Sequence, residues 1–317
     1  MSTSTNQQHL HHITPVNPIE RRKFVKSLIK AAAGTSALLM LPGLGFAQKK
    51  EAGTAPLTIQ QVIDLILKSI PGAPFSQTVD TIKAGDPSQV VKGIVTTMFA
   101  TDEVIERTAA LGANFIIAHE PTFYNHTDDV SWLKNDAVYQ YKRNLLDKNG
   151  ITIWRFHDYI HAHKPDGVLM GVLTALGWQH YYQQEHPRLI TIPTTTLQNI
   201  ITLVKNRLDI PHVRVIGGPT ETCSRIALLP GAAGGKPQMD VIMKEKPDLL
   251  IVGELNEWET SEYIRDLRHM GAKTSLLVLG HIQSEEPGLK WLVEWLQPQL
   301  PGVRITHVPS KDAFRWA

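Results

Sequence analysis

From residue 58 to residue 308, short apolar runs alternate with segments whose apolar residues recur every three or four positions. After Thr58, for example, Ile59, Val62, Ile63 and Ile66 share one face of a helix that the threonine would cap. Similar patterns predict further helices at 101–111, 131–149, 196–207, 238–244, 256–270 and 285–296. Apolar, β-branched runs predict strands at 91–98, 114–118, 151–156, 213–216, 225–229, 248–252, 275–279 and 303–308. Strands that alternate with helices predict an α/β fold with a largely parallel or mixed sheet.

Two of the predicted strands share a short pattern. Gly112-Ala113 leads through an apolar strand to His119, and Gly271-Ala272 leads through a similar strand to His281. A duplication would explain the pattern as two related α/β lobes that each offer a strand end. Chance explains it as well, because glycine is common after a helix.

The first 47 residues resemble a twin-arginine export signal, in which Arg21-Arg22 precedes a mildly apolar run at 28–46. The predicted organisation is a signal peptide (1–47), a linker (48–56) and one α/β domain (57–317) with approximate lobes 57–190 and 191–317. Lys30 and Pro42 make the apolar run a poor permanent membrane span. A disordered basic N-terminus and an uncleaved anchor are the alternatives. We expect a periplasmic or otherwise exported protein.

Charge and cysteine content narrow the class of protein. The chain has 32 basic and 30 acidic residues, but residues 1–47 hold five of the basic and one of the acidic residues, which leaves 27 and 29. The remaining chain is therefore slightly acidic, which argues against a nucleic-acid partner. Cys223 is the single cysteine, so an intrachain disulfide is excluded and stability must come from the core.

Candidate chemistry gathers where predicted strands end. His119-Glu120 directly follows one strand, and His281 follows another, with Glu285 four residues later. If the next helix begins near Ser284, both His281 and Glu285 could face one ion. Imidazole with carboxylate suits zinc, manganese, iron or cobalt better than calcium. A hydrogen bond at the helix entry is the alternative for this pair.

A third strand ends in a dense polar segment. Three histidines and two aspartates lie within ten residues: His157, Asp158, His161, His163 and Asp166. A solvated loop would explain such a segment on its own. Its coincidence with the other two strand ends favours one shared site.

Together these segments resemble the NIF-three-like family of dinuclear-metal proteins, often labelled GTP cyclohydrolase type 2 homologues. The resemblance covers about 58–310. It rests on the stretches 93–97, 101–105, 112–121, 157–161, 176–177, 230–235 and 280–285. It implies two related, intertwined α/β lobes with mixed sheets, a metal site between them at strand ends, and a ring-shaped homohexamer.

The resemblance also implies ligands, with two departures. The family usually has two adjacent histidines before the proline, whereas the second is Glu120 here. The family's next motif has an aspartate where His161 stands. The implied metal ligands, three histidines and two carboxylates, become His119, Glu120, His161, His281 and Glu285. Asp158 and His163 are the substitutes if His161 points away. A decayed site that binds one ion or none is the alternative to this exchange.

The expected function is metal-dependent hydrolysis of a small molecule, a phosphoester or a cyclic amide, because two close divalent ions can activate water. His157 would act beside the ligands by orienting one or by transferring a proton. The glycine-rich turn 231–235 is either a phosphate cradle or a plain loop. The alternative function is a non-catalytic metal-binding scaffold. A dinucleotide-dependent dehydrogenase is disfavoured, because no Gly-x-Gly-x-x-Gly follows a predicted strand.

Overall fold

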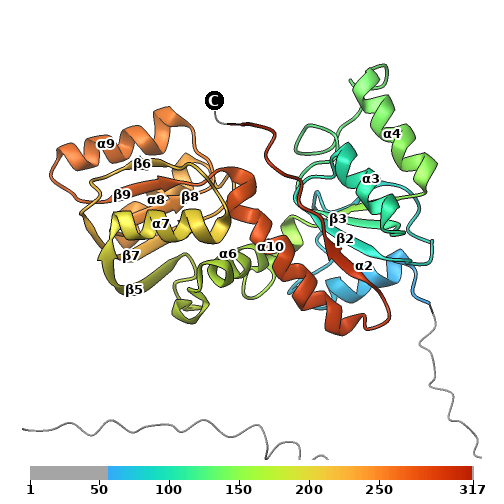
Figure 1. Cartoon of the computed structure of the whole chain (residues 1–317), viewed down its shortest axis with the longest axis horizontal. Helices are drawn as coiled ribbons and strands as arrows, with labels where there is room; N and C mark the ends of the chain where they lie inside the picture. Colours follow the sequence, from blue (N-terminus) through green and yellow to red (C-terminus); the bar gives the residue numbers. More distant parts are fainter. Residues whose placement is uncertain (1–55, 316–317) are drawn as a thin grey trace, which may run out of the picture. The chain divides into compact units, whose positions relative to one another are not determined.

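The computed structural model describes residues 56–315. The predicted signal peptide and all but the last residue of the predicted linker lie outside the described residues. The helices are α2 (Ile59–Leu67), α3 (Asp102–Ala110), α4 (Ala137–Asn149), α5 (Asp158–Ala162), α6 (Gly167–Leu176), α7 (Leu197–Leu208), α8 (Gly235–Glu245), α9 (Glu262–His269) and α10 (His281–Leu296) (Figure 1). The helical pattern after Thr58 is confirmed as α2, which a capping box of Thr58 and Gln61 begins.

The first sheet has the strand order β1-β4-β3-β2-β10. Its strands are β1 (Ile82–Ala84), β2 (Ile94–Thr97), β3 (Phe115–Ala118), β4 (Thr152–Arg155) and β10 (Ile305–His307). β1 is antiparallel to β4, and the other neighbours are parallel. The central strands are buried on both faces, which explains their continuous apolar runs. Because β2, β3 and β4 are parallel, their carboxyl ends lie at the same edge of this sheet.

The second sheet has the strand order β5-β7-β8-β9-β6. Its strands are β5 (Leu189–Thr196), β6 (Arg214–Ile216), β7 (Thr222–Leu229), β8 (Leu249–Val252) and β9 (Ser275–Val278). β7, β8 and β9 are parallel, and the antiparallel strands β5 and β6 form the edges. The predicted pair of mixed sheets is thus confirmed.

Helix α10 ties the two sheets together. It starts just after β9 of the second sheet, and its Leu289, Leu292 and Leu296 are buried in the core of the first. The following strand β10 pairs with β2, so the chain returns to the first sheet. α10 also lies against α6 (Figure 1). A Cβ at Gly171 of α6 would lie 2.4 Å from the carbonyl oxygen of Pro287, so glycine is needed for this close approach.

Among the strands and α-helices, four elements were missing from the sequence-based prediction: β1, α5, α6 and β5. Seven of the ten residues of α6 are buried, so the helix needs apolar residues on nearly every side. Its sequence therefore lacks the periodicity of a surface helix. The helix predicted from 131 begins instead at Ala137, where Asp136 caps it. No helix within 56–315 combines the length and the apolar character that a membrane crossing requires.

The two glycine-alanine strands occupy different places in their sheets. β3 is the middle of three successive parallel strands β2, β3 and β4, whereas β9 is the last of β7, β8 and β9. By chain order, the counterpart of His281 is therefore His157 rather than His119. The short pattern itself adds no support for a duplication.

Candidate metal centre

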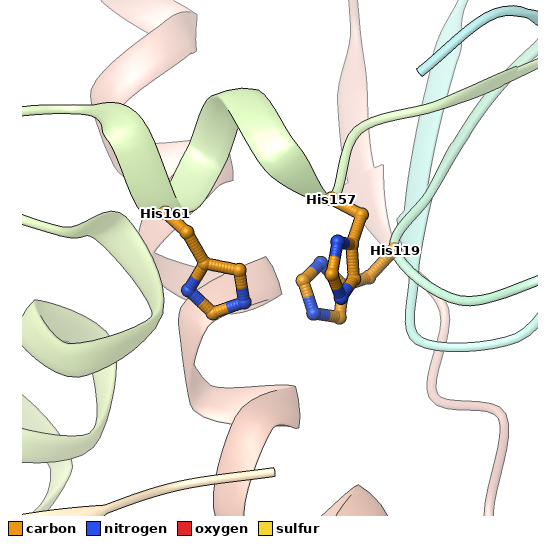
Figure 2. Close-up of side chains that lie close together, drawn as sticks. All are labelled: His119, His157 and His161. Carbon is orange, nitrogen blue, oxygen red and sulfur yellow. The ribbon is translucent and has the colours of Figure 1, made fainter. Parts of the chain in front are cut away.

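The ends of β3, β4 and β9 bring the predicted polar residues together. His119 and Glu120 follow β3, His157 follows β4, and His161 lies one helical turn later on α5. Figure 2 shows the rings of His119 and His157 overlapping, with the ring of His161 facing them. The ring centroids of these three histidines are 4.8 to 5.2 Å apart.

Glu285 and His281 reach the same place from the second sheet. α10 begins at His281 rather than near Ser284, so the two side chains are one turn apart on the same helical face. Nε2 of His281 is 3.0 Å from Oε2 of Glu285 and 3.2 Å from Oε1 of Glu120. The structure thus gathers all five predicted ligands, together with His157.

One candidate ligand group is buried and rich in carboxylate. It consists of His119, Glu120 and Glu285, each with one ligand atom within 4.8 Å of the others. Nδ1 of His119 is 3.1 Å from the carbonyl oxygen of Phe156, so Nδ1 carries the proton and donates. Nε2 of His119 is buried without a hydrogen-bond partner, although Oε2 of Glu285 lies 3.3 Å away.

The other candidate ligand group contains imidazoles alone. It consists of His119, His157 and His161, and it shares His119 with the buried group. Nδ1 of His157 is 2.9 Å from Asp158, and Nδ1 of His161 is 3.0 Å from Asp166. A carboxylate on one ring nitrogen fixes the ring and leaves Nε2 for a ligand, which is the usual support of a metal-binding histidine.

The predicted substitutes lie outside the ligand groups. His163 packs edge-on against Trp291 and Trp295, with Nδ1 2.7 Å from the carbonyl oxygen of Pro165. Asp158 holds His157 and accepts hydrogen bonds from the Thr78 hydroxyl and the Val79 amide. His161 itself points toward the site, since its Nε2 lies 3.9 Å from Glu285.

Arg155 is a residue of this site that the sequence reasoning missed. Its guanidinium is wholly buried and lies 3.4 Å from Oε2 of Glu120. Nε donates to the carbonyl oxygen of His119, and Nη1 donates to that of His126. Arg155 thus holds one oxygen of Glu120 and leaves Oε1 facing His281.

The glycine-rich turn makes room for carboxylates of the protein. A Cβ on Gly231, which has a φ of +68°, would lie 2.0 Å from Oε1 of Glu285. A Cβ on Gly235 would lie 2.2 Å from Oε2 of Glu259. Ser284 accepts a hydrogen bond from the Gly231 amide and fixes the turn beside α10. The close approach of these two carboxylates therefore explains the glycines at 231 and 235 without a bound phosphate.

The charges of the cluster shift its pKa values. Burial raises the pKa of Glu120, but its hydrogen bond to His281 and the neighbouring histidines outweigh this and leave it lowered. The pKa of Glu285 is lowered in the same way, mainly by His119. Burial lowers the pKa of His281, yet Glu120 and Glu285 raise it to about 10. Burial, with His119 nearby, lowers the pKa of His157 to about 4.

A cavity of about 240 Å³ opens onto both groups. Its walls include Glu120, His157, His161, His281 and Glu285, and Arg188 is its one lysine or arginine among the described residues. The donor set of imidazoles and carboxylates fits a divalent transition metal. The buried Nε2 of His119, which has no hydrogen-bond partner, fits one too, because a lone pair removed from water needs a hydrogen-bond donor or a metal ion. The residues present therefore suit the metal centre that the resemblance implies.

Comparison with known proteins decides the family. The model of the Duf34/NIF3 (NGG1p interacting factor 3) family matches residues 58–313. This chain belongs to the Duf34/NIF3 family. It is 24% identical over 242 residues to a Clostridium perfringens protein named GTP cyclohydrolase 1 type 2 homolog, covering 73% of this chain and 87% of that protein.

Solved structures share the Duf34/NIF3 fold. A hypothetical protein of Staphylococcus aureus matches with a TM-score of 0.66 and 19% identity, and a Bacillus cereus protein related to NIF3 matches with 0.66 and 16%. Each match covers 83% of this chain and all of the other. At these identities the likeness establishes the fold, so the chemistry must be argued from this chain's own residues.

Proposed function

We propose that this protein is a metal-dependent hydrolase whose dinuclear centre acts on a phosphoester or a cyclic amide. The observation that carries the proposal is the position of His119, which two three-residue ligand groups share. His119, Glu120, His161, His281 and Glu285 would hold two ions of zinc, manganese, iron or cobalt. When bound, such ions supply Lewis acidity and make water a stronger nucleophile at neutral pH.

The exchange of ligands between two positions preserves the charge of the centre. Glu120 stands where the family resemblance implies histidine, and His161 stands where it implies aspartate. Arg155 beside Glu120 supports the exchange, because a buried carboxylate needs a compensating cation. These features favour a working site over a decayed one.

His157 is the residue we assign to proton transfer. Asp158 fixes its Nδ1, so Nε2 faces Glu120 at 3.9 Å. Its pKa of about 4 keeps it neutral at pH 7, as a group that accepts a proton must be. A role as a ligand is the alternative that the imidazole group allows.

The name of the Clostridium perfringens relative suggests GTP as a substrate, but we propose a broader class. The twin-arginine-like segment leads us to place the protein in the periplasm, where it would meet little GTP. We also propose a homohexamer there, on the family resemblance. The substrate is thus better described by its bond, a phosphoester or a cyclic amide, than by the name of the relative.

Metal content and turnover test the proposal together. We expect about two transition-metal ions per chain by mass spectrometry, and metal-dependent hydrolysis that is lost in His281→Ala. His180→Ala is a matched control, since His180 is exposed and stacks on Tyr181, outside the ligand groups. Two bound ions without turnover of any phosphoester or cyclic amide would favour the scaffold alternative. No metal after reconstitution would mean a decayed site.

A further inference from the structure

A second pocket lies beside the candidate centre, and part of it is lined by α3 and α4. A cavity of about 2210 Å³ has Glu120 and His281 in its wall and continues past Asp102, Thr122 and Lys142. Thr122 follows Glu120 by two residues, so their Cα atoms are at most about 7 Å apart. The pocket therefore lies within reach of a small molecule held at the centre.

Lys142 is the main feature of this pocket. It lies on α4 with only 6% of its surface exposed. Its ammonium donates to the carbonyl oxygen of Thr122 at 3.2 Å, which uses one of its three N–H groups. Burial lowers the pKa of Lys142, and Asp102 and Asp128 oppose this without forming an ion pair within 4 Å. A buried ammonium with spare donors is costly unless a ligand uses them.

Two further groups beside Lys142 lack partners. The hydroxyl of Thr122, a residue 2% exposed, and Oδ1 of Asp102 are buried without a hydrogen bond. Natural proteins seldom leave such atoms unpaired, so each needs an explanation. Cation, hydroxyl and carboxylate together offer both donors and acceptors to one ligand.

Tyr124 adds a flat apolar face to the pocket. Its ring centroid is 4.9 Å from Nζ of Lys142, and half of the residue is exposed. Its φ of 66° is in the left-handed region, which a tyrosine rarely adopts. Such backbone strain is concentrated at functional sites, where the surrounding structure maintains it.

We propose that Lys142, Thr122, Tyr124 and Asp102 form a subsite for the planar cyclic amide of the substrate. The Lys142 ammonium binds the carbonyl oxygen, the Asp102 carboxylate accepts the N–H, and the ring stacks on Tyr124. This inference rests on the proposed hydrolase and selects the cyclic amide over the phosphoester. A phosphate dianion in this subsite would meet the carboxylate of Asp102 with only the Lys142 ammonium to offset both, because Arg155 is already paired with Glu120.

Binding to metal-stripped protein tests the subsite independently of turnover. We expect dihydrouracil and hydantoin to bind in calorimetric titrations, and 1,3-dimethylhydantoin, which lacks the N–H, to bind at least about tenfold more weakly. Lys142→Met should weaken binding by about tenfold to a hundredfold, the usual loss for a hydrogen bond to a charged group. Lys290→Met, an exposed lysine in the wall of the same cavity, should leave affinity unchanged.

Tyr124→Gly keeps the test decisive if Lys142→Met fails to fold. Glycine suits the left-handed backbone, so the Tm should stay level or rise while affinity falls. Binding that survives Lys142→Met, or Lys142-dependent binding of phenyl phosphate that exceeds the amide's, would overturn the subsite. If the amides bind but the protein holds no metal and turns nothing over, the subsite is supported and the proposed hydrolase is contradicted. If the protein hydrolyses phosphoesters but binds no amide, the hydrolase is supported and the subsite is contradicted.

Discussion

The two ligand groups of the candidate centre share His119 but differ in burial and in origin. In the buried group, the side chains of Glu120 and Glu285 are 10% and 4% exposed, whereas those of His157 and His161 are 24% and 32% exposed. The imidazole group comes wholly from the first sheet and its loops. The buried group needs α10, which arrives from the second sheet.

The two ion positions would therefore not be equivalent. The buried group carries two carboxylates, so it attracts a cation more strongly and depends on how α10 packs. The imidazole group contains no carboxylate, and its His157 and His161 are partly exposed, so its ion would exchange more readily.

The largest effect is expected from His119→Ala, which removes the shared ligand. Metal content should fall from about two ions per chain to near zero, because each group loses one of its three residues. Loss of the wholly buried His119 ring should also leave a cavity beside Glu285 and lower the free energy of unfolding. Mass spectrometry and urea unfolding give the two readouts, with His180→Ala as the control. One ion retained at unchanged affinity would show that the groups do not share His119.

Glu120→Ala and His161→Ala should each remove one ion and spare the other. Glu120 belongs to the buried group, and His161 belongs to the imidazole group. The tightly held ion should be lost from Glu120→Ala, and the readily exchanged ion from His161→Ala. Competition with a chelator, followed over time, separates the two. Loss of both ions from each variant would mean that the groups form one cooperative site.

Arg155→Lys should weaken the ion of the buried group by about tenfold to a hundredfold, as for other residues that orient a metal ligand. Lysine keeps the charge but loses the fork that contacts both Glu120 and the carbonyl oxygen of His119. The matched control is Arg143→Lys, an arginine on the surface of α4 that pairs with Asp147. Equal weakening of both ions would contradict a role specific to Glu120.

Arg155 also shows where sequence-based prediction stops. The α/β class, α2 with its cap and the strand ends all followed from local patterns. Arg155 lies in the run Ile153-Trp154-Arg155-Phe156, where a charged residue suggests an exposed position. Only the register of β4 against β3, in which Arg155 pairs with Ala118, brings it beside the residues that follow β3. Contacts between strands distant in sequence leave no local signal.

Gly231 and α6 were beyond sequence reasoning for related reasons. The sequence left the glycine-rich turn as either a phosphate cradle or a plain loop. The close approach of Glu285, which explains Gly231, depends on how α10 packs against the turn. α6 has no polar face, since α10 and the cores cover it. The resemblance to a family named candidate ligands, but only the folded chain showed two unequal groups around His119, one of which includes His157.

The smallest effect should be a pH dependence that differs between the groups. The pKa of His281 is raised to about 10, so without metal it is protonated at pH 7 and pairs with Glu120 and Glu285. A raised pKa stabilises the metal-free fold fully below the unfolded value near 6.5, and this stabilisation is lost as pH rises toward 10. A metal that binds His281 must displace this proton, so its affinity should rise with pH by up to about tenfold per unit.

The imidazole group should show a weaker dependence near neutrality. Both groups share His119, whose pKa is lowered by burial but raised on balance by Glu285, and the imidazole group adds His157 in place of a contact with His281. The pKa of His157 is about 4, so that ring has already lost its proton at pH 7. Calorimetric titrations at pH 6.5, 7.5 and 8.5, in buffers of different ionisation enthalpy, count the protons released with each ion. His281→Asn, which removes the imidazole that contacts both carboxylates of the buried group, should reduce the proton release there, while His161→Ala should leave it unchanged. Equal proton release from both groups would mean that burial does not distinguish them, and the contrast between the two positions would fail.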